Sequence, residues 1–225
     1  MKQRAEIKAL AKECFKEQRG TGILLILLIA IIGGVSGGIA RIPFLGPLID
    51  LAVIFIVLPV LTVGLYGCYL KIYRKETVEL KELFSKFQND LARCLGGMLW
   101  MYLFIILWTL LFTIPGIIKG YAYRMTTFIL AEYPNVKAKE ALKISMKMTK
   151  GYKGKLFMLD LSFIGWAMLS MLTLGILAIV YVMPYYLTSV TGYYEEIKAQ
   201  ALESGAVTME ELTQESGAVA AETLA

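Results

Sequence analysis

The sequence contains no histidine, and only three of its 225 residues are cysteine. Histidine is the commonest general base and metal ligand, so its absence excludes every serine–histidine and cysteine–histidine catalytic arrangement. Cys14, Cys68 and Cys94 form no short-spaced pair, which argues against a disulfide framework. Phosphate-binding loops, zinc-protease motifs and nucleophile elbows are also missing. We therefore expect a non-enzymatic protein with no cofactor and no metal site.

Charge is absent from several long stretches of the chain. The composition is 57% hydrophobic and the mean hydropathy is +0.63, with the apolar residues gathered in runs of about 20. A helix of that length crosses the ~30 Å hydrocarbon core of a bilayer. The net charge of +5 comes from basic residues placed beside these runs, a pattern typical of membrane topology signals. The sequence predicts an integral membrane protein and no nucleic-acid partner.

The fold class that follows is all-α, a polytopic membrane helical bundle in a single domain over residues 1–197. A signal peptide competes with the first span, because a basic leader precedes an apolar run. The leader contains three glutamates, however, and Gly38-Ile39-Ala40 is a poor cleavage site, so we expect an uncleaved span. The six predicted spans are approximately 21–40, 45–70, 95–114, 117–133, 155–173 and 174–194.

The distribution of lysine and arginine decides the topology. Six basic residues precede the first span, six lie in 71–94 and seven in 137–155, whereas the segment between the first two spans holds only Arg41. Basic-rich segments stay in the cytoplasm, which places both termini there. The chain must then recross between residues 114 and 137. We predict that 117–133 is the fourth span and that Pro115-Gly116 is the outer turn before it; a re-entrant excursion is the alternative.

Three polar segments flank the spans. Residues 2–19 place Ile7, Leu10, Ala11, Cys14 and Phe15 at helical spacing among six basic residues, which predicts an amphipathic helix on the membrane surface or a solvated helix. The connections at 71–94 and 135–154 have similar patterns, so the bilayer, including anionic lipids at its cytoplasmic face, is the expected partner. Residues 198–225 read as a flexible acidic tail.

Of the charged residues in the predicted spans, Arg124 and Asp160 lie well inside the ends and need partners. Counting from the span ends places the backbones of Arg124 and Asp160 within about 6 Å of the same depth. Because an unpaired charge is costly in a membrane, we predict that they form an ion pair or share a polar network with Ser162, Thr126 and Thr127. The pair is either the floor of a solute cavity or a structural lock between helices. Asp50, near an outer end, is expected to be interfacial.

Small residues and helix breakers mark further positions. Gly33, Gly34, Gly37 and Gly38 form overlapping small-residue pairs that let another helix approach closely, within the chain or in a dimer. Helix breaks are expected at Pro59, at Pro115 with Gly116, and at Pro184.

The second half of the chain carries a family resemblance. Read in order, IPGIIKGYAYRMTTFILAEYP, EALKISMKMTKGYKGKLF, LDLSFIGW and MPYYLTSVTGYYE, with GLYGCYLKIYRKETVELKELFSKF upstream, resemble the bacterial integral-membrane family catalogued as domain of unknown function 975. The resemblance covers about residues 3–197. It implies a multi-pass protein of the bacterial cytoplasmic membrane with no established activity. We expect an accessory, structural or partner-binding component, with an unidentified protein partner; the alternative is a small-solute or ion transporter or channel.

Overall fold

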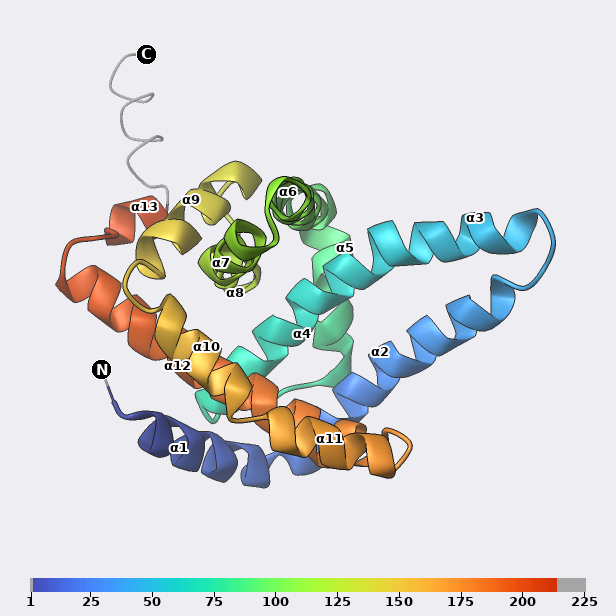
Figure 1. Cartoon of the computed structure of the whole chain (residues 1–225), viewed down its shortest axis with the longest axis horizontal. Coiled ribbons are helices and arrows are strands. Elements are labelled where there is room, and N and C mark those ends of the chain that lie inside the picture. The colour runs from blue at the N-terminus through green and yellow to red at the C-terminus, as the bar shows by residue number, and fades with distance from the viewer. Residues whose placement is uncertain (1, 214–225) are drawn as a thin grey trace, which may run out of the picture.

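The computed structural model describes residues 2–213, which fold into helices joined by short turns (Figure 1). No strand occurs among these residues, so the predicted all-α class is confirmed. In chain order the elements are α1 (Arg4–Glu17), α2 (Arg19–Ile39), α3 (Leu45–Ala52), the π-helical turn η1 (Val53–Val57), α4 (Leu58–Tyr73), the 3₁₀ turn η2 (Leu80–Phe84), α5 (Ser85–Asn89), α6 (Leu91–Leu111), α7 (Thr113–Tyr123), α8 (Thr126–Glu132), α9 (Ala138–Met148), α10 (Lys153–Leu161), α11 (Ile164–Leu172), the π-helical turn η3 (Ala178–Val182), α12 (Met183–Glu203) and α13 (Met209–Thr213).

Four helical stretches of the described chain are long and apolar enough to cross a membrane, which suggests a membrane protein. Each coincides with a predicted span. The other two predicted spans, 117–133 and 174–194, are not among them. The first is divided by a turn between α7 and α8, and the second begins with a turn before η3 and continues into α12. The four stretches are Arg19–Ile39, Leu45–Tyr73, Leu91–Leu111 and Lys153–Leu172.

The helices are arranged as three hairpins, each preceded by a shorter polar helix. The outgoing limbs are α2, α6 and α10–α11, and the returning limbs end in α4, α8 and α12. Among the returning helices, α4 packs on both α8 and α12. The preceding helices reach across to neighbouring hairpins, because α1 packs on α12, η2 on α4 and α9 on α6 and α8. Figure 1 shows the α2–α3 hairpin extending well away from this shared core.

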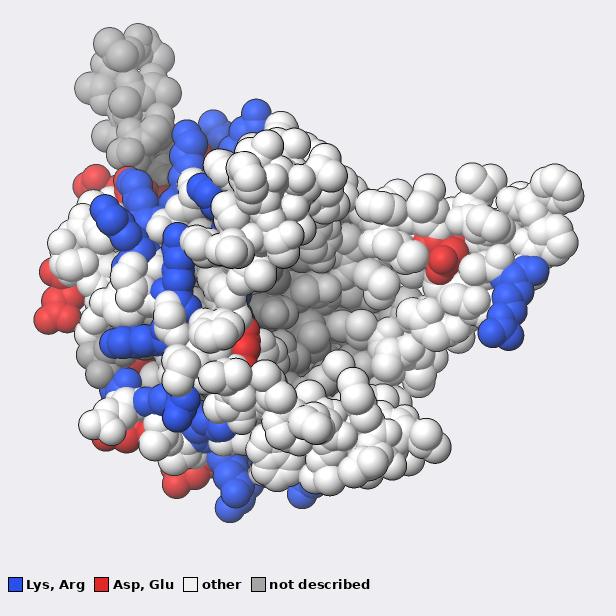
Figure 2. All heavy atoms as spheres, viewed as in Figure 1, with Lys and Arg blue, Asp and Glu red and all other residues white. Residues whose placement is uncertain are grey.

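Charge and apolar surface occupy different parts of the molecule. Figure 2 shows charged side chains gathered over the core side, whereas the hairpin arms are mostly uncharged and the surface between them is hollowed. Large apolar side chains are exposed along the arms, most strongly near the hairpin ends, where Phe44 is 91% and Leu174 is 93% exposed. Exposed apolar surface of this extent is favourable in lipid and unfavourable in water.

The amphipathic face of α1 is covered by protein. Ile7, Ala11, Cys14 and Phe15 are all buried, and α1 packs along α12. The predicted helix is therefore present, but its apolar face contacts another helix where we expected a membrane surface or solvent. A hydrophobic stripe specifies that a face is buried without specifying what buries it.

The apolar face of the polar segment 135–154 is also covered by protein. On α9, Ala141, Leu142, Ile144 and Met148 are buried, and the helix packs on α6, α7, α8 and α12. The basic residues of this segment are left on its outer side, where Lys143 and Lys150 are exposed.

Residues 198–213 form the end of α12, a turn and α13. α12 ends at Glu203, and Val207 and Leu212 are 1% and 0% exposed in the larger core cluster. Lys147 of α9 pairs with Glu211 at 2.5 Å. The predicted tail thus packs against the core as far as α13, and its remaining residues, 214–225, lie outside the described residues.

The turn between α6 and α7 lies at Phe112, earlier in the chain than the predicted turn at Pro115-Gly116. Phe112 has an extended backbone and separates α6 from α7, so Pro115 and Gly116 belong to the first turns of α7. Proline is tolerated at a helix start because the first amide groups have no intrahelical acceptor. Gly116 lies against α6, where an added Cβ would stand 2.3 Å from Thr109 Oγ1. The two limbs therefore pack too closely for a larger residue at this position.

Pro59 and Pro184 occupy equivalent places in their hairpins. Each stands at the start of a returning helix, α4 or α12, directly after a π-helical turn. Because proline cannot donate to the carbonyl four residues earlier, a wider turn at this point accommodates it.

Candidate functional site

Arg124 and Asp160 lie face to face in the structure. Arg124 Nη1 donates to Asp160 Oδ2 at 2.8 Å, and Nη2 donates to Oδ1 at 2.9 Å. This two-point arrangement is the strongest geometry available to a guanidinium and a carboxylate. The side chain of Arg124 is 14% exposed and that of Asp160 is 31% exposed. The structure thus brings together the two charges that depth counting had paired.

Two tyrosines complete the site. Tyr121 donates its hydroxyl to Asp160 Oδ2 at 2.7 Å, and Tyr186 donates to Oδ1 at 2.8 Å. Arg124 also donates to the Tyr186 hydroxyl, and its guanidinium carbon lies 5.6 Å from the centre of each tyrosine ring. An ionised carboxylate has about four acceptor positions. All four on Asp160 are taken by side chains of this chain.

The site is built where a helix is interrupted. Arg124 and Met125 form the turn between α7 and α8, which frees backbone groups on both sides of it. Ser145 of α9 closes the gap, since it donates to the Ala122 carbonyl at 2.8 Å and accepts from the Met125 amide at 3.1 Å. Thr149 donates to the same Ala122 carbonyl at 3.1 Å. Protein side chains thus occupy backbone positions that, in an interrupted membrane helix, can bind a ligand.

The other three residues of the predicted network lie elsewhere. Ser162 accepts from Lys8 Nζ of α1 at 3.2 Å and donates to the Leu159 carbonyl. Thr127 is buried with its hydroxyl 3.7 Å from Met98 Sδ. The Thr126 hydroxyl is buried and has no hydrogen-bond partner among the described residues.

The glycines of α2 do not meet another helix closely. At Gly33, Gly34, Gly37 and Gly38, no heavy atom of a described residue outside their own helix lies within 4 Å of an added Cβ. Close packing within the chain is therefore not made at these positions, and the dimer interpretation stays a prediction.

Asp50 also finds a partner inside its hairpin. Ser36 of α2 donates to Asp50 Oδ1 at 2.5 Å, and the Ser36 residue is 3% exposed. We expected this carboxylate to reach the headgroups. The bond to Ser36 joins the two limbs of the hairpin, and the interfacial position of Asp50 stays a prediction.

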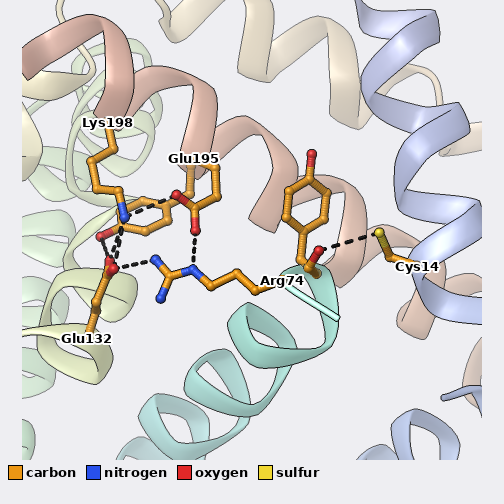
Figure 3. Close-up of polar contacts among 7 residues, drawn as sticks. Cys14, Arg74, Glu132, Glu195 and Lys198 are labelled. Atoms are coloured by element: carbon orange, nitrogen blue, oxygen red, sulfur yellow. Dashed lines mark hydrogen bonds and ion pairs between the residues drawn. The ribbon is translucent and has the colours of Figure 1, made fainter. Parts of the chain in front are cut away.

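A larger polar cluster joins the three returning helices, and sequence reasoning missed it. Figure 3 shows Arg74 from α4, Glu132 from α8, and Glu195 and Lys198 from α12 converging on one another. Arg74 Nε lies 2.7 Å from Glu195 Oε1, and Lys198 Nζ lies 2.8 Å from Glu132 Oε1 and 3.0 Å from Glu195 Oε2. Arg74 Nη2 also pairs with Glu132. These ion pairs connect all three hairpins at the charged side of the molecule.

The cluster contains two cations, Arg74 and Lys198, and two carboxylates, Glu132 and Glu195, so its charges cancel. Burial lowers the pKa of Arg74, but hydrogen bonds to Glu132 and Glu195 outweigh it and the pKa is raised overall. The residues of the cluster are far apart in the sequence: Arg74 lies in the charged connection 71–94, Glu195 and Lys198 follow the last predicted span, and Glu132 lies in the predicted fourth span. Only the glutamate at the end of an otherwise apolar stretch, Glu132, hinted that a cation would be needed there.

The family comparison agrees with the sequence motifs. The family model described as "Protein of unknown function (DUF975)" matches residues 1–119 and again 97–201, so most of the chain is covered. The chain belongs to this family. No curated protein and no solved structure matches the chain.

Proposed function

We propose that the protein is a non-enzymatic component of the bacterial cytoplasmic membrane that acts as a structural or partner-binding scaffold. Among the described residues, the polar groups at membrane depth bond to one another and hold helices together. The observation that carries this proposal is the saturation of Asp160, whose carboxylate accepts from Arg124 twice and from Tyr121 and Tyr186 once each. A solute binding there would have to displace one of these donors.

A transporter or channel is the alternative. The interruption between α7 and α8 favours it, because transporters use broken helices to bind their substrates. Asp160, at 31% side-chain exposure, is also the more accessible partner of the ion pair. Against this alternative stand Ser145 and Thr149, which satisfy the freed backbone groups, and the absence of Ser162, Thr126 and Thr127 from the polar network.

We further propose six passes, with both termini in the cytoplasm. The three hairpins support this, because each outgoing limb is followed by a returning one. The distribution of charge supports it as well, since lysine and arginine cluster before the first limb, between the first two hairpins and in 137–155. The fourth pass would combine α7 and α8, whose 18 helical residues and intervening turn reach about 30 Å if they are collinear. The expected partners are lipids, and a protein not yet identified.

The abundance of an Asp160→Asn variant tests the scaffold proposal. Removing the charge leaves Arg124 without its counter-ion at membrane depth, so we expect the folded, membrane-inserted protein to fall several-fold. Asp50→Asn is the matched control, because Asp50 has one hydrogen-bond partner and its loss leaves no buried cation. An Asp160→Asn protein that accumulates normally but abolishes a solute flux would favour the transporter.

A further inference from the structure

A groove with cationic walls lies between the first turns of α1 and α10. Its volume is about 480 Å³, within the range of small-ligand sites. The residues that line it are Lys2, Gln3 and Arg4 at and just before the start of α1, Gly154, Lys155 and Met158 of α10, and Tyr193 of α12. The groove is separate from both the Arg124 site and the cluster around Glu132.

The walls of the groove have a net positive charge. Lys2, Arg4 and Lys155 line it, and Glu196 lies 3.1 Å from Lys2 Nζ. Arg4 makes one side-chain hydrogen bond within residues 2–213, from Nη1 to the Met158 carbonyl at 3.2 Å. A guanidinium has five N–H donors in a planar fork suited to phosphate, so Arg4 retains donors for an anion.

The groove lies at one end of a helical stretch that is able to cross a bilayer. Lys153–Leu172 is one of the four stretches able to cross a membrane, and the groove lies at its first turn. Lys155 is thus placed where phospholipid phosphates meet the end of a spanning helix. Met158 and Leu161 follow Gly154 at helical spacings of four and seven residues, and each is 46% exposed. An apolar track therefore leads from the cationic groove along the span.

We propose that this groove binds the phosphate of an anionic phospholipid, with Arg4 and Lys155 contacting the headgroup and an acyl chain lying along Met158 and Leu161. The inference rests on the proposed membrane placement and is independent of the role of Arg124. Gly154 gives the groove its depth, because nothing lies within 4 Å of an added Cβ there. The site also gives the amphipathic helix α1 a contact with lipid through its first turn, although its apolar face is covered by α12.

Short-chain phospholipids added to the detergent-purified protein test the proposal. We expect dihexanoyl phosphatidylglycerol to raise the unfolding temperature, and neither dihexanoyl phosphatidylcholine nor inorganic phosphate to match it. The double variant Arg4→Gln/Lys155→Gln should raise the apparent dissociation constant for phosphatidylglycerol about tenfold or more, given the energy of each cation near an anionic headgroup. Lys143→Gln/Lys150→Gln removes the same charge from the exposed side of the α9 segment and should leave the constant unchanged.

A second variant tests the shape of the groove independently of its charge. Gly154→Leu keeps every cation and fills open space, so it should fold normally and still weaken phosphatidylglycerol binding. Equal effects of the two double variants would show a general surface attraction and overturn the proposal. Full stabilisation by inorganic phosphate, or an unchanged constant in Gly154→Leu, would overturn it too. The proposed membrane placement is tested separately, by cysteine labelling of the hairpin ends.

Discussion

Arg124 donates two parallel hydrogen bonds, of 2.8 and 2.9 Å, to Asp160, which lies 36 residues later in the chain. The contact fastens the turn between α7 and α8 to α10, so it ties the second hairpin to the third. The cluster around Glu132 adds contacts among α4, α8 and α12. These two groups of polar residues link three hairpins that also share a buried apolar core.

Ser145 provides a direct test of how the helix interruption is stabilised. Ser145→Ala removes the side-chain acceptor of the Met125 amide and one of the two side-chain donors to the Ala122 carbonyl, so it should lower the free energy of unfolding by about 1–3 kcal/mol. The matched control is Thr126→Val, which removes a buried hydroxyl that has no partner among the described residues and should be neutral or stabilising. Detergent-solubilised unfolding curves compare the two. If Thr126→Val proves the more damaging change, the assignment of these hydrogen bonds is wrong.

The close packing of α6 on α7 is tested by two glycines of the same helix. Gly116→Ala would place a methyl group 2.3 Å from Thr109 Oγ1 and 2.7 Å from its Cα, so it should destabilise the protein by about 1–3 kcal/mol. At Gly120 nothing lies within 4 Å of the added Cβ, and alanine there should stabilise the helix by up to about 1 kcal/mol. The difference in unfolding temperature between the variants measures the effect. Equal temperatures would mean that the two limbs are farther apart.

Cysteine labelling tests the six-pass topology. Single cysteines at Phe44, Phe112 and Leu174, which are 91%, 65% and 93% exposed near the hairpin ends, should react with a membrane-impermeant maleimide added to intact cells. A cysteine at Met209, which is 52% exposed, should react only after the membrane is opened. The three native cysteines are buried and should give little background. Protection of residue 112 or 174 in intact cells would contradict the corresponding pass.

How much the sequence predicts depends on the range of the interaction concerned. Arg124 and Asp160 could be paired because a charge in an apolar run needs a partner and helix rise fixes its depth. The interruption at Arg124 could not be foreseen, because it is stabilised by Ser145 and Thr149 of a helix about 20 residues later. Ser162 is close to Asp160 in sequence, yet its hydroxyl accepts a hydrogen bond from Lys8 of α1.

The covering of α1 illustrates a second limit. Periodicity places Ile7, Leu10, Ala11, Cys14 and Phe15 on one face; Leu10 is half-buried and the other four are buried. The burial of that face by α12, and not by lipid, depends on packing between the two ends of the chain. A local pattern carries no information about such a contact. The Glu132 cluster was missed for the same reason, since its members come from three distant helices.

The measurement that tests the scaffold account most directly is a double-mutant cycle on Arg124 and Asp160. The free energy of unfolding is compared for the wild type, Arg124→Gln, Asp160→Asn and the double variant. If the pair locks the hairpins together, the single changes will each leave a charge unpaired at membrane depth, and the coupling energy will be about 1–3 kcal/mol. The free energy of unfolding of the double variant will then be no lower than that of the less stable single variant. A coupling energy near zero, with all four proteins equally stable, would contradict the account.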